Sequence, residues 1–527
     1  MLVYGDHSES ASPRERLDAV GETLAAVAAM PAGLERHSRL VGALVEAGQL
    51  LQGVADLGAA SDELNAFLYD LAKSAIRSWD TGFAEIGNLP ALPGGDLPPC
   101  VELRLPEGFA FYAVYPEAYA DAARKLRLSG LPRVIGIRSI GTTLGAVVAA
   151  AIGAPPPITV RPFGDPFARE VEVPAGLIGR DYHYVIVDEG PGLSGSSFGA
   201  VADWLEARGV PPERIAFLPS HDGDPGPHAS ERHRTRWSNA QRIAAELEPR
   251  FLAKRFGPLQ PCSTGHPGER LKYLGTHEGR PVLLKFAGLG GIGERKLQMA
   301  RALHAAGLVP EPAGFAHGFI VERWCEGAET PSGKPVQQIA GYIGARARLF
   351  PATREDGASV HRLFEMSRRN ASLALGENAG ETLERWTPML DALSRRVVPV
   401  RTDNKLHREE WLRTSGGHLL KCDALDHHCA HDLIGCQDMA WDVAGAVVEF
   451  ELDDAEAAVL VDATTRAAGR YVDPELLEFC RIAYCCFRAG QASISGDQAA
   501  AHRYGSVLND LLHQHDCRGT RQESSVG

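Results

Sequence analysis

Apolar residues in the first ninety positions recur every three or four residues, which is the spacing of one face of an α-helix. The run from Leu17 to Val27 follows a serine–proline pair, a common start of a helix. The same spacing recurs around residues 40–45 and 64–71. We therefore expect residues 1–90 to form a helical region that docks on the rest of the chain, with a homodimer through these helices as an alternative.

After a proline-rich stretch at residues 89–100, short runs rich in β-branched and aromatic residues alternate with helical stretches. Residues 184–187 are apolar without interruption, which is typical of a strand buried on both faces of a sheet. Strands that alternate with helices in this way predict a doubly wound parallel sheet. The sequence therefore predicts an α/β domain over residues 98–237.

The remaining chain predicts a linker followed by a domain with two lobes. Residues 238–270 are expected to form a helical linker. Residues 271–517 begin with two strands around a turn that contains Gly279, and a helix-rich half follows from about Val336. A bilobal α+β domain is the expected result.

Composition narrows the classes of partner. The 527 residues carry a formal net charge of −13, which argues against a surface that binds a nucleic acid polymer. The ten cysteines lie mostly in apolar surroundings, as reduced thiols do. No apolar run approaches the roughly 20 residues that span a bilayer, and the first residues lack the apolar core of a signal peptide. We expect a cytoplasmic protein that acts on small molecules and has no membrane partner.

The most informative segment is residues 184–197, where an apolar strand ends in two acids and a turn of small residues follows. The carboxylates of Asp188 and Glu189 suit the 2′- and 3′-hydroxyls of a ribose, because ionised oxygens accept strong hydrogen bonds. The turn opens a helix, whose first N–H groups attract a 5′-phosphate. The residues predicted to bind this phosphate are Ser194, Gly195, Ser196 and Ser197.

This segment resembles the phosphate loop of the type I phosphoribosyltransferases, and the likeness covers residues 101–218. It implies Mg²⁺-assisted displacement of diphosphate from phosphoribosyl diphosphate by a nitrogen nucleophile, with Asp188 and Glu189 as catalytic residues. A strand followed by Arg-Ser-Ile-Gly-Thr stands where that family has its diphosphate loop, and residues 155–180 stand where it has a mobile hood. The implied diphosphate-binding residues are Arg138, Ser139, Gly141, Thr142, Arg161 and Arg169. Binding of some other phosphate, or an inactive relic of the family, are the alternatives.

A second group of residues points to ATP. Lys285 ends an apolar strand, and Glu294 lies nine residues later near the start of a helix. A strand lysine paired with a helix glutamate orients the phosphates of ATP in kinase-like folds. Asp403 precedes a hairpin whose second strand ends at Asp423. These two aspartates suit the positioning of an acceptor hydroxyl and the binding of Mg²⁺.

Residues 271–450 are similar to the aminoglycoside-phosphotransferase branch of the protein-kinase superfamily. The resemblance implies that Asp403 is catalytic, that Asp423 is a metal ligand, and that an aspartate in residues 438–444 supports the catalytic loop. Arg408 stands where the family has a metal-binding asparagine, and residues 401–403 read Arg-Thr-Asp in place of His-Gly-Asp. The sequence offers three candidates to replace the asparagine: Glu409, Asp426 and His428.

Cysteines and histidines are frequent in residues 422–436, which raises the alternative of a zinc site. The run contains no Cys-x-x-Cys pair, and its spacing matches no structural zinc pattern. We expect His427 and His428 to line the phosphate site or to cap a turn instead.

These features together favour a bifunctional enzyme that transfers a phosphoribosyl group and phosphorylates a ribosylated small molecule with ATP. Two alternatives remain. One is a regulatory protein that senses phosphoribosyl diphosphate or a nucleotide and has an inactive kinase half. The other is a small-molecule kinase whose α/β domain senses a ligand.

Overall fold

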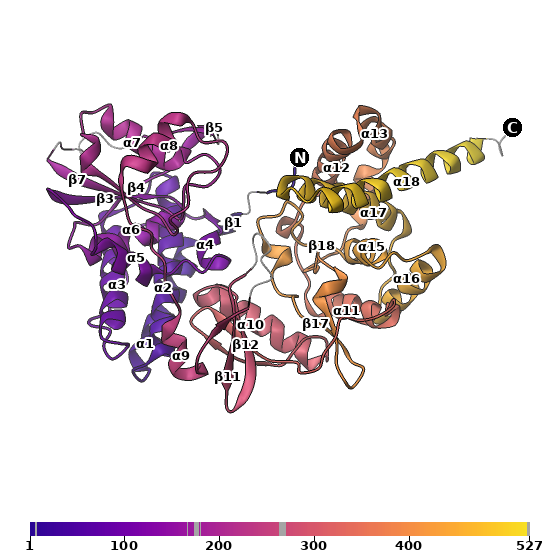
Figure 1. The fold of residues 1–527 in the computed structure, drawn as a ribbon, viewed down its shortest axis with the longest axis horizontal. Coiled ribbons are helices and arrows are strands. Elements are labelled where there is room, and N and C mark those ends of the chain that lie inside the picture. The colour runs from indigo at the N-terminus through magenta and orange to yellow at the C-terminus, as the bar shows by residue number, and fades with distance from the viewer. Residues whose placement is uncertain (6–7, 166, 173–178, 180, 263–269, 524–527) are drawn as a thin grey trace.

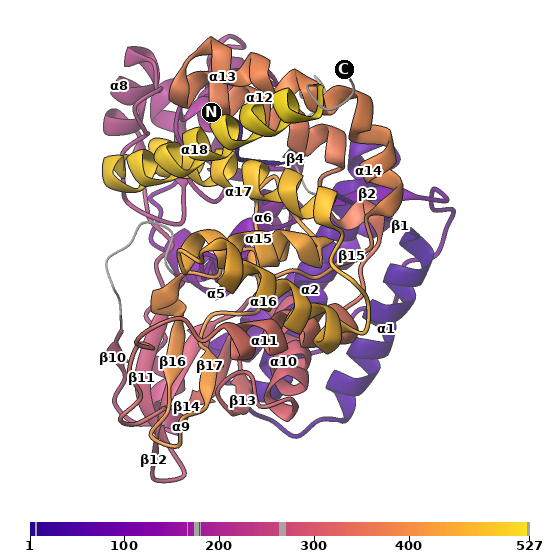
Figure 2. The same cartoon turned by 90° about the vertical axis from the view of Figure 1, so that its right-hand side faces the viewer.

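The computed structural model describes residues 1–527 except 6–7, 166, 173–178, 180, 263–269 and 524–527. For residues 514–523 it describes the backbone without the side chains. Figure 1 shows the N-terminal helices and the parallel sheet on one side and the C-terminal helices on the other. A smaller sheet and helix α10 lie between them. Turned by 90°, the C-terminal helices lie towards the viewer and the smaller sheet forms one end of the molecule (Figure 2).

The predicted parallel sheet is present and has five strands in the order β4-β3-β7-β8-β9. Apolar side chains cover both of its faces: Val134 and Val185 pack on one side, and Ile135 and Ile186 on the other. The sheet is therefore doubly wound, as predicted. Its strands are β3 (Leu131–Ile137), β4 (Ile158–Val160), β7 (Tyr182–Val187), β8 (Ile215–Leu218) and β9 (Gln241–Arg242). The helices around it are α4 (Glu107–Ala110), α5 (Pro116–Ala123), α6 (Ile140–Ala151), α7 (Ser196–Glu206) and α8 (Glu231–Asn239), and the hairpin β5 (Phe163–Asp165) and β6 (Ala168–Glu170) follows β4.

The predicted N-terminal helices are α1 (Pro13–Ala29), α2 (Leu34–Asp56) and α3 (Asp62–Asp80). The hydroxyls of Ser12 and Ser61 accept hydrogen bonds from backbone N–H groups and cap α1 and α3. All three helices share one apolar core with α5, α6 and one face of the parallel sheet. This core continues into the second sheet. The helical region therefore covers the α/β domain within the same chain, and the homodimer stays a prediction.

Residues 238–270 differ from the predicted helical linker. They contain β9, the helix α9 (Arg250–Phe256) and the short strand β10 (Gln260–Pro261), while residues 263–269 lie outside the described part. Strand β9 completes the parallel sheet and β10 begins the second sheet. The sequence did not predict these two-residue edge strands. They are polar and short, and they form only by pairing with strands elsewhere in the chain.

The second sheet is antiparallel, with strand order β10-β11-β12-β14-β13. The predicted first hairpin turns at Glu278 and Gly279, which both have positive φ, as tight hairpin turns require. Helix α10 (Gly290–Ala305) connects β12 to β13. The remaining strands are β11 (Lys272–His277), β12 (Arg280–Phe286), β13 (Pro312–Ala316) and β14 (Phe319–Arg323).

Helices dominate the C-terminal part, and with the second sheet they form the two lobes that the sequence predicted. The predicted hairpin before Asp423 is β16 (Trp411–Arg413) and β17 (Leu419–Lys421), and β15 (Pro399–Val400) pairs with β18 (Gln437–Asp438). The helices are α11 (Val336–Leu349), α12 (Val360–Leu375), α13 (Glu377–Thr382), α14 (Leu390–Arg396), α15 (Met439–Glu449), α16 (Asp454–Ala468), α17 (Pro474–Ser495) and α18 (Gln498–Glu523).

The N-terminal residues join the two halves of the molecule. The carbonyl oxygen of Val3 accepts a hydrogen bond from the N–H of Leu433, and the N–H of Gly5 donates to the carbonyl oxygen of His431. Strand β1 (Ser8–Ala11) then pairs with β2 (Val101–Arg104) next to the parallel sheet. Within the described residues, no helix is both long and apolar enough to cross a membrane.

Candidate functional site

A cavity of about 1000 Å³ opens at the carboxyl ends of β3 and β7. The strand order reverses direction between these two strands. After β3 the chain places β4 on one side of β3 and then β7 on the other. Ligands of open α/β sheets bind at such a switch point. The predicted residues that line the cavity are Arg138, Ser139, Arg161, Arg169, Asp188 and Glu189.

The other predicted residues of this site are placed beside or beneath the cavity. Ser194, just before α7, and Ser196, the first residue of α7, are buried and do not line the cavity. Gly195 has a φ of +63° and precedes this helix, and Ser197 lies within its first turn. Gly141 and Thr142 lie in the first turn of α6. A Cβ atom at Gly141 would lie 2.6 Å from the carbonyl oxygen of Val187, so only glycine lets α6 approach β7 this closely.

The two adjacent acids, Asp188 and Glu189, both have raised pKa values. Burial raises the pKa of Asp188 to about 7, although the N–H of Glu189 donates a hydrogen bond of 2.8 Å to its carboxylate. Burial, and then the nearby Asp188 and Glu107 carboxylates, raise the pKa of Glu189 to about 8. A raised pKa at adjacent acids in a cavity marks a candidate binding site. Hydroxyl groups of a bound sugar would favour the ionised carboxylates by donating to them.

Asp56, at the end of α2, orients two of the cavity arginines, and sequence reasoning missed it. Its carboxylate lies 3.0 Å from Nη1 of Arg138 and 2.5 Å from Nη2 of Arg161. Burial alone would raise the pKa of Asp56, but hydrogen bonds from Arg161 and Arg138 outweigh it and hold the pKa below its usual range. Asp56 lies 82 positions before Arg138, so no local pattern connects the two.

One wall of the cavity is shared with the C-terminal half. Phe111 and Tyr112 line the cavity, together with Gly5, Ser8 and Leu271. The guanidinium carbon of Arg270 lies 4.3 Å from the centre of the Phe111 ring. The same guanidinium pairs at 3.3 Å with Asp426, three residues after Asp423. The cavity and the predicted metal residue Asp423 are therefore separated by a few side chains.

Lys285 lies at the predicted place near the end of β12, but its partner differs from the prediction. Its Nζ atom lies 3.5 Å from Asp423 and 3.7 Å from Glu322 of β14, and it donates to the carbonyl oxygen of Cys422. Burial, which would lower the pKa of Lys285, is outweighed by these two carboxylates, so its pKa is raised. The lysine is therefore charged.

Glu294 is not among the ion-pair partners of Lys285 in the described structure, so the predicted strand-to-helix pair is corrected to Lys285 with Glu322. The reason is the rotation of α10. Lys296, two residues on and about 200° away around the helix axis, points into the site and pairs with Asp426 at 3.1 Å. Glu294 lies instead near Glu46 of α2, where its charge contributes to a raised pKa of the Glu46 carboxyl after burial, the main cause.

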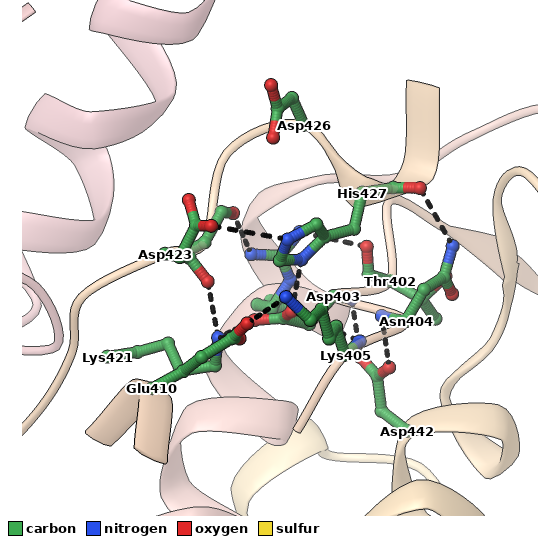
Figure 3. Close-up of polar contacts among 12 residues, drawn as sticks. Thr402, Asp403, Asn404, Lys405, Glu410, Lys421, Asp423, Asp426, His427 and Asp442 are labelled. Atoms are coloured by element: carbon green, nitrogen blue, oxygen red, sulfur yellow. Dashed lines mark hydrogen bonds and ion pairs between the residues drawn. The ribbon is translucent and has the colours of Figure 1, made fainter. Parts of the chain in front are cut away.

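The backbone of the predicted catalytic loop is fixed by Asp442, as the resemblance implied. Its two carboxylate oxygens accept hydrogen bonds of 2.8 and 2.9 Å from the N–H groups of Asp403 and Asn404 (Figure 3). Burial, followed by the charge of Asp403, raises the pKa of Asp442 to about 6. The side-chain amide of Asn404 donates to the carbonyl oxygen of Gly435. This loop is thus held by α15 and by the segment that contains Gly435.

The carboxylate of Asp403 is closed off from solvent. It lies 3.0 Å from Nδ1 of His427 and 3.5 Å from Nζ of Lys421, and it accepts a hydrogen bond from the hydroxyl of Tyr342. Its side chain has no exposed surface. Burial would raise the pKa of Asp403, but Lys421 and His427 outweigh it and lower the pKa. Asp403 is therefore ionised but already engaged.

His427 lies between the two predicted aspartates (Figure 3). Its Nε2 atom is 3.5 Å from Asp423, whose side chain is 27% exposed. Burial would lower the pKa of His427, but hydrogen bonds to Asp403 and Asp423 outweigh it and raise the pKa to about 9. The histidine therefore places a positive charge where both carboxylates meet.

A divalent cation fits the donor set around Asp423. Carboxylate oxygens are the ligands that Mg²⁺ prefers, and ion pairs with nearby cations lower the pKa of both Asp423 and Asp426. Carboxylate oxygens of these two aspartates lie within 4.8 Å of each other, so they can share one cation. Asp426 is thus the best placed of the three predicted substitutes for asparagine. The guanidinium of Arg408 lies over the ring of Phe450, outside this group.

No protein-family model and no curated protein matches this chain. Solved structures that resemble it include choline kinase LicA from Streptococcus pneumoniae, with a TM-score of 0.36 and 16% identity over 50% of this chain and 96% of that one. A choline/ethanolamine kinase family protein from Mesorhizobium loti gives a TM-score of 0.33 and 16% identity over 50% and 90% of the two chains. Macrolide 2′-phosphotransferase type I gives a TM-score of 0.33 and 13% identity over 50% of this chain and 94% of that one. Likenesses of this size assign no activity to this chain.

Proposed function

We propose that this chain is a phosphoribosyl diphosphate-dependent transferase in its α/β half and an ATP-dependent small-molecule phosphotransferase in its C-terminal half. One observation carries the first part. Side chains from β6 and from the segments after β3, β4 and β7, which the acid pair and the family resemblance pointed to, line a single cavity at the switch point of the sheet. That cavity presents arginines at one place and a pair of acids at another, as a sugar with a diphosphate group requires.

In this proposal Asp188 and Glu189 accept hydrogen bonds from the ribose hydroxyls, and N–H groups at the start of α7 bind the 5′-phosphate. Arg161 and Arg169 compensate the charge of the leaving diphosphate. The bond between C1′ and the diphosphate oxygen breaks, a bond from C1′ to a nitrogen of the acceptor forms, and the acceptor's proton passes to solvent. Mg²⁺ carried by the diphosphate would supply further positive charge.

The second part of the proposal places the phosphates of ATP beside Lys285 and a divalent cation at Asp423 and Asp426. The acceptor is then a small molecule that reaches the catalytic loop at Asp403. The wall formed by Phe111 and Arg270 lies between this site and the cavity. This proximity supports a ribosylated product of the first site as the substrate of the second.

The direct test measures diphosphate released from phosphoribosyl diphosphate by the full chain with Mg²⁺ and a panel of nucleobases and other nitrogen acceptors. Release that depends on one acceptor class, with the ribosylated product identified by mass spectrometry, would support the transferase. ATP consumption without any diphosphate release would favour the small-molecule kinase with a sensing domain. If the chain neither releases diphosphate from phosphoribosyl diphosphate nor binds it, the first part of the proposal is wrong.

Replacing Asp56 by asparagine should raise the KM for phosphoribosyl diphosphate by roughly tenfold, with a smaller change in kcat. The arginines would keep their charge but lose the carboxylate that orients them, and about 1.4 kcal/mol of binding energy corresponds to tenfold in affinity. Steady-state kinetics with Asp181→Asn as the matched control would check this, because Asp181, just before β7, is fully exposed and lies 4.0 Å from Arg214. Equal KM values in the two variants would contradict the orienting role.

A regulatory protein with an inactive kinase half is the second candidate, and one observation favours it. The Asp403 carboxylate is buried and engaged by Lys421 and His427, so no acceptor hydroxyl reaches it in this arrangement. Phosphoryl transfer would require His427 to move away when ATP and its metal ion bind. A regulator would need no such movement, because nucleotide binding at Lys285 alone could transmit a signal across the shared wall.

The variant Asp403→Asn separates these two candidates. If the C-terminal half is a phosphotransferase, ATP consumption should fall by at least about a hundredfold, since the carboxylate that orients the acceptor is lost. ATP affinity, measured by calorimetry, should stay within a few fold of the wild type. Unchanged consumption would remove Asp403 from the catalytic role and favour the regulator.

A further inference from the structure

Three buried residues meet away from both sites described above. His37 lies in α2, Glu117 in α5, and His317 in the turn between β13 and β14. Their exposed fractions are 0%, 3% and 1%. Nε2 of His37 lies 2.7 Å from Oε1 of Glu117, and Nε2 of His317 lies 2.9 Å from the same oxygen. Two imidazole nitrogens and one carboxylate oxygen therefore converge on one point.

No lysine or arginine pairs with this group in the described part of the chain. Within the described residues, the ion pairs of Glu117 are with His37 and His317 alone. Buried carboxylates in proteins are normally paired with a cation or bound to a metal ion.

The hydrogen bonds between the three residues leave part of their capacity unused. Among the described residues, no group pairs with Nδ1 of His37, Nδ1 of His317 or Oε2 of Glu117, although all three atoms are buried. Unpaired buried polar atoms are rare in native structures and call for an explanation. Oε2 of Glu117 in particular could join Oε1 as a second ligand to a cation.

The turn that carries His317 also points to a role for its side chain. His317 and Gly318 have φ values of +42° and +94°, the geometry of a tight hairpin turn. Asparagine, aspartate or glycine is favoured at such a position, which normally faces solvent. Here the turn is buried, and the hydroxyl of Tyr115 donates to the carbonyl oxygen of His317. The side chain of His317 is thus buried against Glu117 instead of facing solvent.

The geometry points to a metal site, and we propose that His37, Glu117 and His317 bind one divalent transition-metal ion, with Zn²⁺ the best fit. Two imidazoles and a carboxylate form a donor set that zinc favours. Tetrahedral zinc would separate its ligand atoms by about 3.3 Å, so each imidazole would retract by roughly 0.5 Å. Oε2 of Glu117 or a water molecule would complete the coordination.

The surroundings favour a structural role over a catalytic one. The rings of Phe83 and Trp79 lie 4.8 and 6.1 Å from the ring of His37, and those of Tyr115 and Phe251 lie 5.2 and 5.3 Å from the ring of His317. These aromatic side chains exclude bulk water and substrate. The ion would join the N-terminal helices, the α/β domain and the second sheet. This inference does not depend on the proposed function.

Metal analysis of the full chain, purified without a metal-affinity step, tests the proposal. We expect about one zinc per chain, removal of the metal by a strong chelator with a lower melting temperature, and recovery of both on adding Zn²⁺. Co²⁺ added to the chelated protein should give the visible absorption of a tetrahedral nitrogen–oxygen site. His317→Gln should abolish the metal and the Co²⁺ spectrum, while His361→Gln, at an exposed histidine on α12, should change neither.

Two results would overturn the proposal. The first is wild-type protein without metal whose melting temperature and spectrum are unchanged by added Zn²⁺ or Co²⁺, which would leave a hydrogen-bonded group only. The second is a His317→Gln protein that folds and still binds one metal ion, which would place the ion elsewhere. If His317→Gln does not fold, the wild-type chelation, reloading and Co²⁺ measurements decide the matter alone.

Discussion

Asp188→Asn is expected to lower diphosphate release from phosphoribosyl diphosphate by at least about a hundredfold. In the proposed transferase, the carboxylate accepts hydrogen bonds from ribose hydroxyls as positive charge develops on the sugar, and an amide neither carries the charge nor accepts as strongly. Losing one such oriented group in a closed site typically costs a hundredfold to a thousandfold in rate. Single-turnover and steady-state release assays with the best acceptor would measure the loss.

The fold of the Asp188→Asn variant should be unharmed, which separates this effect from misfolding. Because the pKa of Asp188 is raised to about 7 in the fold, the folded state holds the proton more tightly than the unfolded chain does. Stability contributed by this group is therefore lost as pH rises through 7. At pH 8 the asparagine variant should melt at the same or a higher temperature than the wild type. Asp181→Asn serves as control, and an Asp188→Asn rate equal to the wild-type rate would refute the assignment.

Lys285→Met is expected to weaken ATP binding by at least tenfold. The lysine is the buried cation nearest to the place proposed for the phosphates, and methionine keeps the length of the side chain without the charge. Calorimetric titration with ATP and Mg²⁺ would measure the change, with Lys254→Met on the exposed face of α9 as control.

The single variant also leaves Glu322 and Asp423 without their shared cation, and breaking a buried pair can cost about 3–5 kcal/mol of stability. The double variant Lys285→Met/Glu322→Gln removes both charges and should regain melting temperature without regaining ATP affinity. Glu294→Gln should bind ATP as the wild type does, because Glu294 is directed towards α2. Weaker binding in Glu294→Gln would restore the strand-to-helix pair that the sequence suggested.

Short stretches of sequence were enough to locate most elements and the acids of the candidate site. The capped N-terminal helices, the hairpin turn at Gly279 and the strand that ends at Asp188 all depend on contacts within a few residues of each other. The parallel sheet itself was also predicted, since alternating strands and helices leave few topologies. The prediction of a helical linker at residues 238–270 was wrong because the strands there are only two residues long and form by pairing with neighbouring strands in the two sheets.

The sequence by itself determined which side chains are candidates to bind sugar, phosphate and metal, because those capacities belong to residue types and to local turns. Only the tertiary structure decided which of them meet. Asp56 reaches Arg138 across 82 positions, and Lys285 meets Asp423 across 138. Glu117 joins histidines that are 80 and 200 positions away. Such pairs depend on how helices and sheets pack and rotate against one another. A rotation of α10 by half a turn would have given Lys285 a different partner without any change in the local sequence pattern.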